Sequence, residues 1–382
     1  MSKRRWLALA VIIAAVSLAR ASNEAEFNPP SGIPADVWQY FVPRDNPVTS
    51  AKVELGRQLF FDKRLSIDSS VSCATCHDPK LAFTDGRPVA QGVGARLGKR
   101  NSPTLLNSMF NAGQFWDGRA ESLEAQAIQP LINVDEMGNA SHEQVVLRLR
   151  SLPQYVARFN DVFGSEITID SLARALASFE RTLISSDSPF DRFIAGDLDA
   201  MSDEARRGFA IFRGKARCTV CHSISQFSLQ SFPFFTDQMF HNTGVAVNDH
   251  AFEPLAKQLS AAGKGTVDSS ELLSIARREG SSSLGRFMTT GDSLDMGAFR
   301  TPSLRDVELT APYFHDGSAK TLLDVVKFYT KAGNNNLNRD WELQSLSLTD
   351  TEQQELVEFL KSLTSDHTRR LVATESARVI AQ

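Results

Sequence analysis

The sequence predicts a mainly α-helical protein with little β structure, composed of two similar helical units. Two observations lead to this expectation. The pentapeptide Cys-X-X-Cys-His occurs twice, at Cys73–His77 and at Cys218–His222, and the two copies contain all four cysteines of the chain. Each copy also lies between two stretches with helical periodicity, one before it and one further along the chain.

The pentapeptide has a specific chemical meaning. Two cysteines separated by two residues can each add to a vinyl group of a haem, and the histidine that follows can ligate the iron. Two copies therefore predict two covalently bound c-type haems, one on Cys73 and Cys76 with His77, the other on Cys218 and Cys221 with His222. A structural zinc site or two disulfides would use the same cysteines and is the alternative.

The stretches that precede the two motifs share one design. Ser50–Phe60 and Ser202–Phe212 each begin with a serine suited to cap a helix, and each has glycine six residues and phenylalanine ten residues after that serine. The shared spacing predicts an entry helix before each motif. Coincidence between two ordinary amphipathic helices is the alternative.

The stretches that follow the motifs also match. Asp170 is expected to cap a helix that contains Phe179 and Leu183, and the capping box Thr349–Glu352 opens a helix with the same Phe and Leu spacing at Phe359 and Leu363. An entry and an exit helix around each motif are the minimum that a small c-type cytochrome needs to cover a haem. We therefore expect two cytochrome c-like helical domains.

The domain boundaries follow from these elements. We place the first haem domain at 49–190 and the second at 196–382, with a linker between them at the Ser-rich and Gly-Asp turns. A polar stretch at about 247–285 is expected to be a helical surface insertion, either decoration or a partner-binding feature. The Pro-rich segment 22–48 is expected to be an irregular arm that Trp38 and Phe41 attach to the body. Whether the C-terminal tail packs on the first domain is left open.

Residues 1–21 have the features of a secretory signal peptide: three basic residues, an apolar run from Trp6 to Ala19, and an Ala-Arg-Ala cleavage site. The apolar run is short for a membrane span, so we expect cleavage and a periplasmic location. An uncleaved anchor is the alternative, and only then would the chain contact a membrane.

Cleavage would change the formal charge from −4 to −8 by removing four basic residues. This acidic balance argues against nucleic acid as a partner.

The two haems are expected to differ in accessibility, because an iron with a free sixth position can bind peroxide whereas a fully ligated iron transfers electrons. The loop Asp78–Asn101 after the first motif contains no histidine and no methionine. We therefore expect the distal face of the first haem to be free or to hold water. A ligand from elsewhere, such as His142, is the alternative.

Several longer motifs resemble those of the bacterial di-haem cytochrome c peroxidase and MauG superfamily. They are Arg100–Asn107, Phe115–Arg119, Glu124–Pro130, Glu136–Met137 and Ala311–Gly317. The resemblance extends over roughly residues 53–363 of the chain. It implies an oxidoreductase that uses hydrogen peroxide as its oxidant.

The resemblance also implies roles around the first haem. Glu136 would be the distal acid–base residue, and Gln126 and Pro130 would line the same pocket. A carboxylate suits this chemistry, because breaking the O–O bond requires a proton to move from one peroxide oxygen to the other. Without the resemblance, Glu136 would be read as a solvated loop charge. Trp116 would relay electrons or holes between the haems, or else fill the domain interface as a buried aromatic residue.

The second haem shows a departure from the peroxidase branch. After Ala311–Gly317 the peroxidase branch has a methionine ligand on the next helix, whereas the MauG branch has a tyrosine. This chain has no methionine after Met296, and Tyr329 shares a helical face with Leu322 and Val326. We expect Tyr329 to ligate the second haem, where a phenolate would favour the higher oxidation states of iron. A core tyrosine with a hydrogen-bonded hydroxyl is the alternative.

Other positions carry further expectations. The resemblance implies a calcium ion between the domains, bound by Asn101 and by the carbonyls of Thr310 and Pro312, and oxygen ligands suit calcium. We expect either pairing with haem propionates or an ordinary surface location for two cations, Arg300 and Arg305. We expect structural, hydrogen-bonding roles for two histidines, His241 and His315.

Three functions agree with these observations. The first is reduction of hydrogen peroxide at the first haem, with electrons passing through the second haem from a small c-type cytochrome or cupredoxin. The second is MauG-like oxidation of tryptophan or another side chain on a partner protein, which Tyr329 and Trp116 favour. The third is a di-haem electron carrier without catalysis. The sequence leaves open the donor or protein substrate, and whether the chain forms a homodimer.

Overall fold

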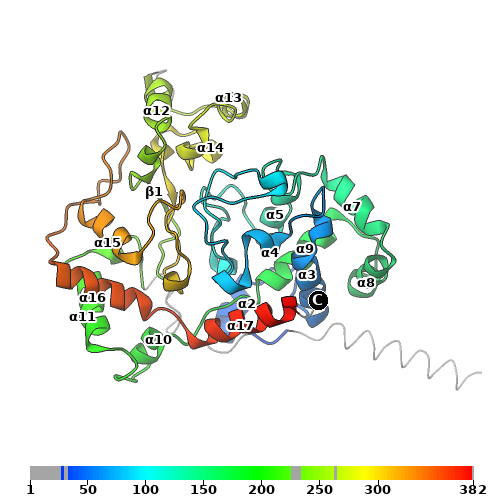
Figure 1. Ribbon diagram of the computed structural model, residues 1–382, viewed down its shortest axis with the longest axis horizontal. Coiled ribbons are helices and arrows are strands. Elements are labelled where there is room, and N and C mark those ends of the chain that lie inside the picture. The colour runs from blue at the N-terminus through cyan, green and yellow to red at the C-terminus, as the bar shows by residue number, and fades with distance from the viewer. Residues whose placement is uncertain (1–26, 30–32, 225–233, 262–264, 381–382) are drawn as a thin grey trace, which may run out of the picture.

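The computed structural model describes residues 27–29, 33–224, 234–261 and 265–380. Helices make up most of its regular structure, and the only strands in these ranges are β1 (Phe240–His241) and β2 (Phe299–Arg300), paired antiparallel (Figure 1). The prediction of a mainly α-helical chain with little β structure is confirmed. Among the helices described here, none has both the length and the apolar character needed to cross a membrane. The signal-peptide prediction concerns residues outside the described ranges.

In the first unit, the entry helix α3 (Ser50–Phe61) packs against the exit helix α9 (Ile169–Glu180). Gly56 lies where the two helices cross, and a β-carbon at this position would be 1.9 Å from the carbonyl oxygen of Ala175. Only a residue without a side chain permits this approach. The caps lie one and two residues before the expected ones, because the side chains of Thr49 and Thr168 accept the capping hydrogen bonds.

The second unit repeats this crossing with α11 (Asp203–Arg213) and α16 (Asp350–Lys361). A β-carbon on Gly208 would be 1.9 Å from the carbonyl oxygen of Glu355. Here the predicted caps are confirmed, since Ser202 caps α11 and Thr349 forms the capping box of α16. The glycine noticed in both entry helices therefore has the same physical role in both units.

The other helices surround these two pairs. In the first unit and its arm they are α2 (Ala35–Phe41), α4 (Cys73–Cys76), α5 (Leu123–Ala127), α6 (Gln129–Ile132), α7 (His142–Arg150) and α8 (Pro153–Phe163). Later in the chain they are α10 (Pro189–Ile194), α12 (Phe252–Ala261), α13 (Ser269–Ile275), α14 (Phe287–Thr290), α15 (Leu322–Thr330) and α17 (Asp366–Ile380). Short 3-10 turns are η1 (Lys63–Leu65), η2 (Pro79–Leu81), η3 (Val93–Ala95), η4 (Ser108–Phe110), η5 (Cys218–Val220), η6 (Val245–Asn248), η7 (Ser281–Leu284), η8 (Ser293–Asp295) and η9 (Val307–Leu309).

Two connecting segments contain helices that were not expected, and the C-terminal tail adopts the packing on the first unit that the sequence left open. The arm contains the helix α2, and Phe41 in it packs edge-on against Phe110 at a centroid distance of 5.0 Å. The expected linker contains the helix α10, whose Phe190 is part of the hydrophobic core of the second unit. The C-terminal helix α17 returns to the first unit, where it contacts η2 and packs Leu371 and Val372 on the core (Figure 1).

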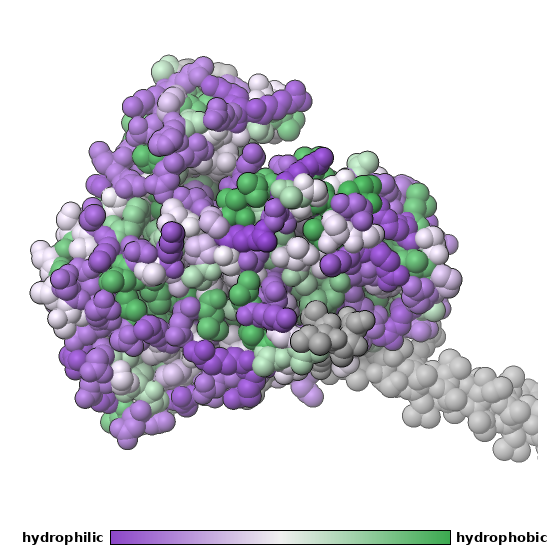
Figure 2. Space-filling view, viewed as in Figure 1, coloured by the Kyte–Doolittle hydropathy of each residue, from purple (hydrophilic) through white to green (hydrophobic). Residues whose placement is uncertain are grey.

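The insertion is a lobe with its own hydrophobic core. Phe252 and Leu255 of α12, Ile275 of α13 and Phe287 of α14 are buried together in this core. Its outer surface is largely hydrophilic, and it projects above the body of the molecule (Figure 2). Arg286 connects the lobe to the first unit by donating hydrogen bonds to the carbonyls of residues 117 and 118.

The duplication extends to two loops that face each other between the units. Phe115 and Phe314 have positive φ angles of 64° and 70°, and each loop is closed by an isolated bridge, Gln114 with Ala120 and Tyr313 with Ala319. Trp116 and His315 therefore occupy equivalent positions. Each also accepts a backbone hydrogen bond of 2.8 Å from the opposite unit: Arg300 N donates to Trp116 O, and Asn101 N donates to His315 O. The two units thus meet in a nearly two-fold manner.

Candidate active site

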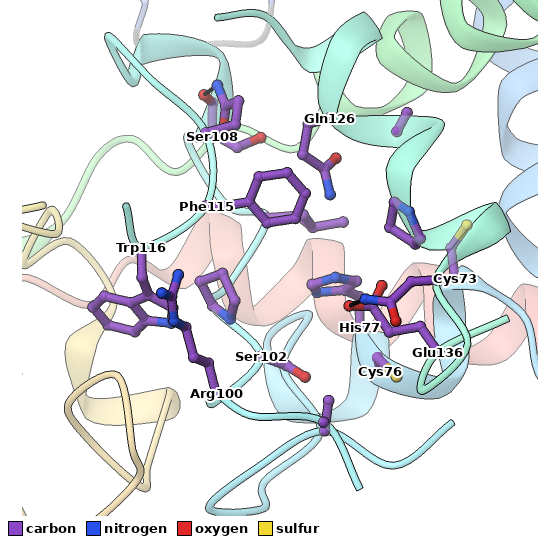
Figure 3. Close-up of a pocket in the computed structure, with 18 of the residues that line it drawn as sticks. Cys73, Cys76, His77, Arg100, Ser102, Ser108, Phe115, Trp116, Gln126 and Glu136 are labelled. Carbon is purple, nitrogen blue, oxygen red and sulfur yellow. Dashed lines mark hydrogen bonds between the residues drawn. The ribbon is translucent and has the colours of Figure 1, made fainter. Parts of the chain in front are cut away.

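Two cavities are associated with the two pentapeptides. The first, of about 290 Å³, is lined by Cys73, Cys76 and His77 (Figure 3). The second, of about 260 Å³, is lined by Cys218, Cys221 and His222. All four cysteines are free thiols, so the disulfide alternative is not observed among them. Each cavity therefore presents two thiols and an imidazole on one wall, which is the donor set that a covalently bound haem requires.

The two histidines are held in the same orientation. Nδ1 of His77 lies 3.1 Å from the carbonyl oxygen of Phe83, and Nδ1 of His222 lies 2.9 Å from that of Phe235. Because a carbonyl only accepts hydrogen bonds, Nδ1 carries the proton in each ring, and Nε2 is left as a donor for a metal. Burial lowers the pKa of both imidazoles, which keeps them neutral as ligands must be.

A buried arginine lies between the two cavities. Arg300 lines both of them and is 6% exposed. Its Nη1 donates to Asn111 Oδ1 at 3.0 Å, and no carboxylate in the described part of the chain pairs with it. Burial lowers the pKa of Arg300 to about 10. An unpaired cation is costly in such a place, so an anionic group that enters the cavities, such as a haem propionate, would stabilise it.

Arg305 has a different partner from the expected propionate. Its guanidinium lines the second cavity but forms two hydrogen bonds with the carboxylate of Asp191, at 2.8 and 2.7 Å. The side chain is 1% exposed, so it is not the surface cation of the alternative interpretation either. Because Asp191 already balances its charge, Arg305 is a structural cation that ties α10 to the second unit, and Arg300 is the better candidate for a propionate.

The three residues expected to surround peroxide lie in the first cavity. Glu136, Gln126 and Pro130 all line it, and Figure 3 shows Gln126 and Glu136 on the same cavity as His77. Nδ2 of Asn133 donates to Oε1 of Glu136 at 2.8 Å, which orients the carboxylate. Burial raises the pKa of Glu136, and the positive charge of Arg119 opposes this shift. A carboxyl group in this position can accept a proton and return it.

His142 does not supply a ligand to this cavity. Its Nε2 lies 2.9 Å from the carbonyl oxygen of Ile128, and the residue is not part of the cavity wall. The wall does contain Met137, which is 4% exposed and directly follows Glu136. Apart from the pentapeptide itself, this thioether is the one sulfur or imidazole donor among the described lining residues.

Tyr329 lines the second cavity together with Leu322 and Val325, as the helical pattern of α15 predicts. Burial raises the pKa of its phenol well above the ordinary value, and a hydrogen bond with Thr243 acts in the opposite direction. The buried hydroxyl would therefore be neutral unless a metal stabilises the phenolate. This behaviour fits a ligand that loses its proton on binding iron.

Trp116 is one of several residues that line both cavities, and it is the aromatic one among those described. Its indole lines both, and Nε1 donates to the carbonyl oxygen of Asn101 at 2.9 Å. Its structural equivalent His315 is buried in the wall of the second cavity, where its ring stacks on Phe299 at 3.5 Å between centroids. Unlike Trp116, His315 lines the second cavity but not the first.

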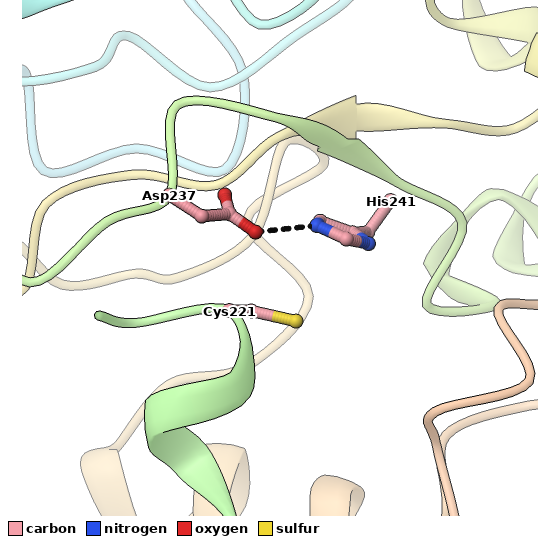
Figure 4. A group of neighbouring side chains, drawn as sticks. All are labelled: Cys221, Asp237 and His241. Carbon is pink, nitrogen blue, oxygen red and sulfur yellow. Dashed lines mark hydrogen bonds and ion pairs between the residues drawn. The ribbon is translucent and has the colours of Figure 1, made fainter. Parts of the chain in front are cut away.

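His241 bridges two acidic residues next to the second motif. Its Nε2 lies 2.8 Å from Oδ2 of Asp237 (Figure 4), and its Nδ1 contacts Asp340. The hydrogen bond with Asp237 is the largest cause that raises the pKa of His241 to about 11. Together with Cys221 the group could hold a metal ion, but this cysteine belongs to the pentapeptide. The contacts agree with the structural role expected for His241, because they tie the loop of Asp340 to the second motif.

The three residues expected to bind calcium lie on the wall of the second cavity. They are Asn101, Thr310 and Pro312. The Nδ2 atom of Asn101 donates to the carbonyl of Arg87 at 2.8 Å, which leaves its Oδ1 as a ligand atom. All three donors are neutral oxygens of a type that calcium accepts. The donor set is therefore suitable, although it contains no carboxylate.

Comparisons with known proteins agree with this geometry. A family model described as di-haem cytochrome c peroxidase matches residues 50–199. Cytochrome-c peroxidase IdrP1 of Denitromonas iodatirespirans is 38% identical over 364 residues, which cover 94% of this chain and 92% of the relative. Methylamine utilization protein MauG of Methylorubrum extorquens is 38% identical over 349 residues, which cover 91% and 85%.

A solved structure shows the same fold over nearly the whole chain. The crystal structure of a MauG-like protein associated with microbial copper homeostasis superposes with a TM-score of 0.70 at 31% identity. The match covers 92% of this chain and 97% of that chain. Two cavities suited to haem, a carboxylate in the first and a tryptophan that lines both thus occur in a chain that matches a cytochrome-c peroxidase over 92% of the length of that relative. The chain belongs to the di-haem cytochrome c peroxidase family, and is an oxidoreductase that acts on peroxide and holds two haems.

Proposed function

We propose that the chain is a periplasmic c-type peroxidase that reduces hydrogen peroxide in the first cavity. Electrons would come through the second cavity from a small donor protein, a c-type cytochrome or a cupredoxin. The observation that carries this proposal is that Glu136 and Gln126 share a cavity with His77, while Trp116 lines both cavities. The two units would form domains near 49–190 and 196–382, except that Phe190 of α10 packs in the core of the second unit and α17 returns to the first.

Both haems would be covalently bound through the thiols of the pentapeptides, with His77 and His222 as iron ligands. When bound, a haem supplies the iron that binds peroxide and exchanges electrons with it. The carboxylate of Glu136 would take a proton from one peroxide oxygen and return it to the other, while Asn133 holds it in place and Gln126 and Pro130 shape the pocket.

The groups between the cavities would serve electron transfer and assembly. Trp116 would relay electrons or holes, because among the described residues it is the aromatic one that lines both cavities. The unpaired guanidinium of Arg300 would bind a haem propionate. A calcium ion on Asn101, Thr310 and Pro312 would connect the two units.

The proposal is tested by steady-state turnover of hydrogen peroxide with a reduced c-type cytochrome as donor, with the di-haem protein assayed before and after pre-reduction. We expect the donor to be oxidised in a peroxide-dependent manner, at two donor molecules per peroxide. Absence of turnover in both states, together with ferric absorption spectra that neither peroxide nor cyanide changes, would instead indicate a di-haem electron carrier.

Met137→Leu tests whether the first haem has a free sixth position. We expect the ferric absorption spectrum to stay the same and the rate of peroxide turnover to change less than about two-fold, because leucine and methionine fill similar volumes. If the Met137 thioether occupied that position, the variant would convert the first haem to a high-spin form and raise peroxide binding. A conversion of this kind would contradict an open distal face.

A second candidate function is favoured by Tyr329, which lines the second cavity where the peroxidase branch has a methionine. A phenolate ligand would stabilise the oxidised haem and store an oxidising equivalent. The second haem could then drive oxidation of tryptophan or another side chain on a partner protein. A long-lived oxidised state after peroxide addition to the di-ferric protein would favour this function, and rapid return to ferric only with a donor cytochrome would favour the peroxidase.

Tyr329→Phe tests the ligand assignment directly. We expect the absorption and electron paramagnetic resonance spectra of the second haem to change, and its midpoint potential to rise, because the hard anionic donor is lost. The matched control is Tyr313→Phe, since Tyr313 lines the same cavity but its hydroxyl donates to the carbonyl of Val307 at 3.0 Å. Unchanged spectra in Tyr329→Phe would mean that Tyr329 is a core residue.

A further inference from the structure

Glu180 is a buried acid that the chemistry described above does not use. It is the last residue of the exit helix α9, is 4% exposed, and lines the first cavity together with His77 and Glu136. Its Oε2 atom is buried and has no hydrogen-bond partner among the described residues. Burial of an unpaired carboxyl group costs free energy, so its location in this cavity needs a reason.

The second unit shows that the fold does not need an acid at this position. Phe179 of α9 corresponds to Phe359 of α16, so the equivalent of Glu180 is Leu360. Leu360 is buried and lines the second cavity. A leucine therefore fills the same helical position well, and the carboxyl group is specific to the cavity that contains Glu136.

Charged and titratable groups face Glu180 from its own helix and from two others. Arg181 follows it on α9, Glu124 faces it from α5, and the Cys73 thiol faces it from α4. Burial is the largest influence and raises the pKa of Glu180 to about 8, while Arg181 lowers it and Glu124 raises it. The neutral form of Glu180 is therefore favoured at neutral pH.

A series of hydrogen bonds leads from Arg181 towards the surface. Nη1 and Nη2 of Arg181 donate to the two carboxylate oxygens of Glu124 at 2.8 and 2.9 Å. Glu124 also accepts from Nδ2 of Asn46 at 2.7 Å, and Oδ1 of Asn46 accepts from Nζ of Lys52 at 3.0 Å. Glu180 lines the cavity and is adjacent in sequence to Arg181, from which this polar network extends to Lys52 of α3.

We propose that Glu180 couples the arrival of electrons in the first cavity to the uptake of protons. Reduction of hydrogen peroxide to two water molecules consumes two electrons and two protons, and the donor protein supplies the electrons. Glu136 only moves a proton from one peroxide oxygen to the other, so both additional protons must enter the cavity from outside. An electron added to the cavity favours protonation of a neighbouring carboxylate. Glu180, which is protonated at neutral pH, would release its proton to the water that is formed and would be reprotonated from outside when the next electron arrives.

The inference rests on the proposed haem in the first cavity and is tested by the midpoint potential of that haem. Glu180→Gln and Glu180→Leu are titrated as complete di-haem proteins, with Asp170→Asn as control because Asp170 lies on the same helix but its side chain is 69% exposed. In the wild type and the control, we expect the potential to fall as pH rises through the region around pH 8. In both Glu180 variants this dependence should be lost. If the midpoint potential of a folded Glu180→Leu protein fell with pH as steeply as that of the wild type, the proposal would be overturned.

A stability measurement gives an independent readout. A carboxyl group whose pKa is higher in the folded than in the unfolded protein contributes stability below its unfolded pKa, and this is lost as pH rises through its folded pKa. Relative to Glu180→Leu, the wild type should therefore lose stability to urea between about pH 5 and about pH 9. The infrared band of a buried carboxylic acid should disappear in both variants.

If the stability of the wild type relative to Glu180→Leu instead rose with pH, Glu180 would be an ionised, paired residue. If these pH effects were present without any peroxide turnover, the proposed function would fail but the proton coupling would stand.

Discussion

Replacement of Glu136 by glutamine is expected to lower peroxide turnover by about 100- to 10 000-fold, the usual contribution of a positioned acid–base group. The amide keeps the size of the side chain, and its oxygen can still accept the hydrogen bond from Asn133. It cannot accept a proton from peroxide, so bond cleavage should slow while haem content and the ferric spectrum are retained. Single-turnover mixing with peroxide, followed by absorbance, separates this chemical step from delivery of electrons.

The pH dependence of turnover supplies a second signature of Glu136. Its carboxyl group must be ionised to accept a proton, so turnover should fall as pH decreases below its pKa. Because burial raises that pKa, the decline should begin above the range of an ordinary carboxyl group, and it should be absent in Glu136→Gln. Glu166→Gln is the matched control, since the Glu166 side chain is 84% exposed. An unchanged acid limb in Glu136→Gln would assign the proton transfer to another group.

The sequence alone was sufficient for the features that depend on short-range patterns. The pentapeptides lie beside cavities, and the glycine repeated in both entry helices lies at both helix crossings. Tyr329 faces the second cavity because helical periodicity determines the side on which it lies. These features are encoded by residues close together in the chain, so spacing alone predicts them.

Features that depend on contacts between distant residues could not be predicted in this way. The partner of Arg305 is Asp191, more than 100 residues earlier in the chain, and no local pattern connects them. The equivalence of Trp116 and His315 is suggested by the shared sequence Phe-X-Asp-Gly, but that the two loops are closed by matching bridges is seen only in the structure. Glu180 could have been noticed from the sequence. It aligns with Leu360 of the second unit, so an acidic residue stands where the equivalent exit helix has an apolar one.

Gly56→Ala and Gly208→Ala are each expected to lower the free energy of unfolding by about 2–3 kcal/mol, as overpacking of a close contact does. In either variant the new β-carbon would lie 1.9 Å from a backbone oxygen of the exit helix, so the two helices must separate by more than an ångström. This cost outweighs the gain of about 1 kcal/mol that alanine brings to an exposed helix interior. Urea unfolding monitored by circular dichroism measures the difference, and Gly265→Ala, where nothing lies within 4 Å, is the control.

The two glycine variants should differ in which haem they affect, because each crossing supports one cavity. Gly56→Ala should alter the absorption of the first haem and peroxide binding, whereas Gly208→Ala should alter the Tyr329-dependent spectrum of the second. Unfolding of a two-unit chain need not be a single transition, so the haem signals identify which unit is lost first. If either variant kept wild-type stability and spectra, the helices of that unit would be able to separate without cost. The glycine repeated at this position would then reflect common ancestry of the two units and not a requirement of packing.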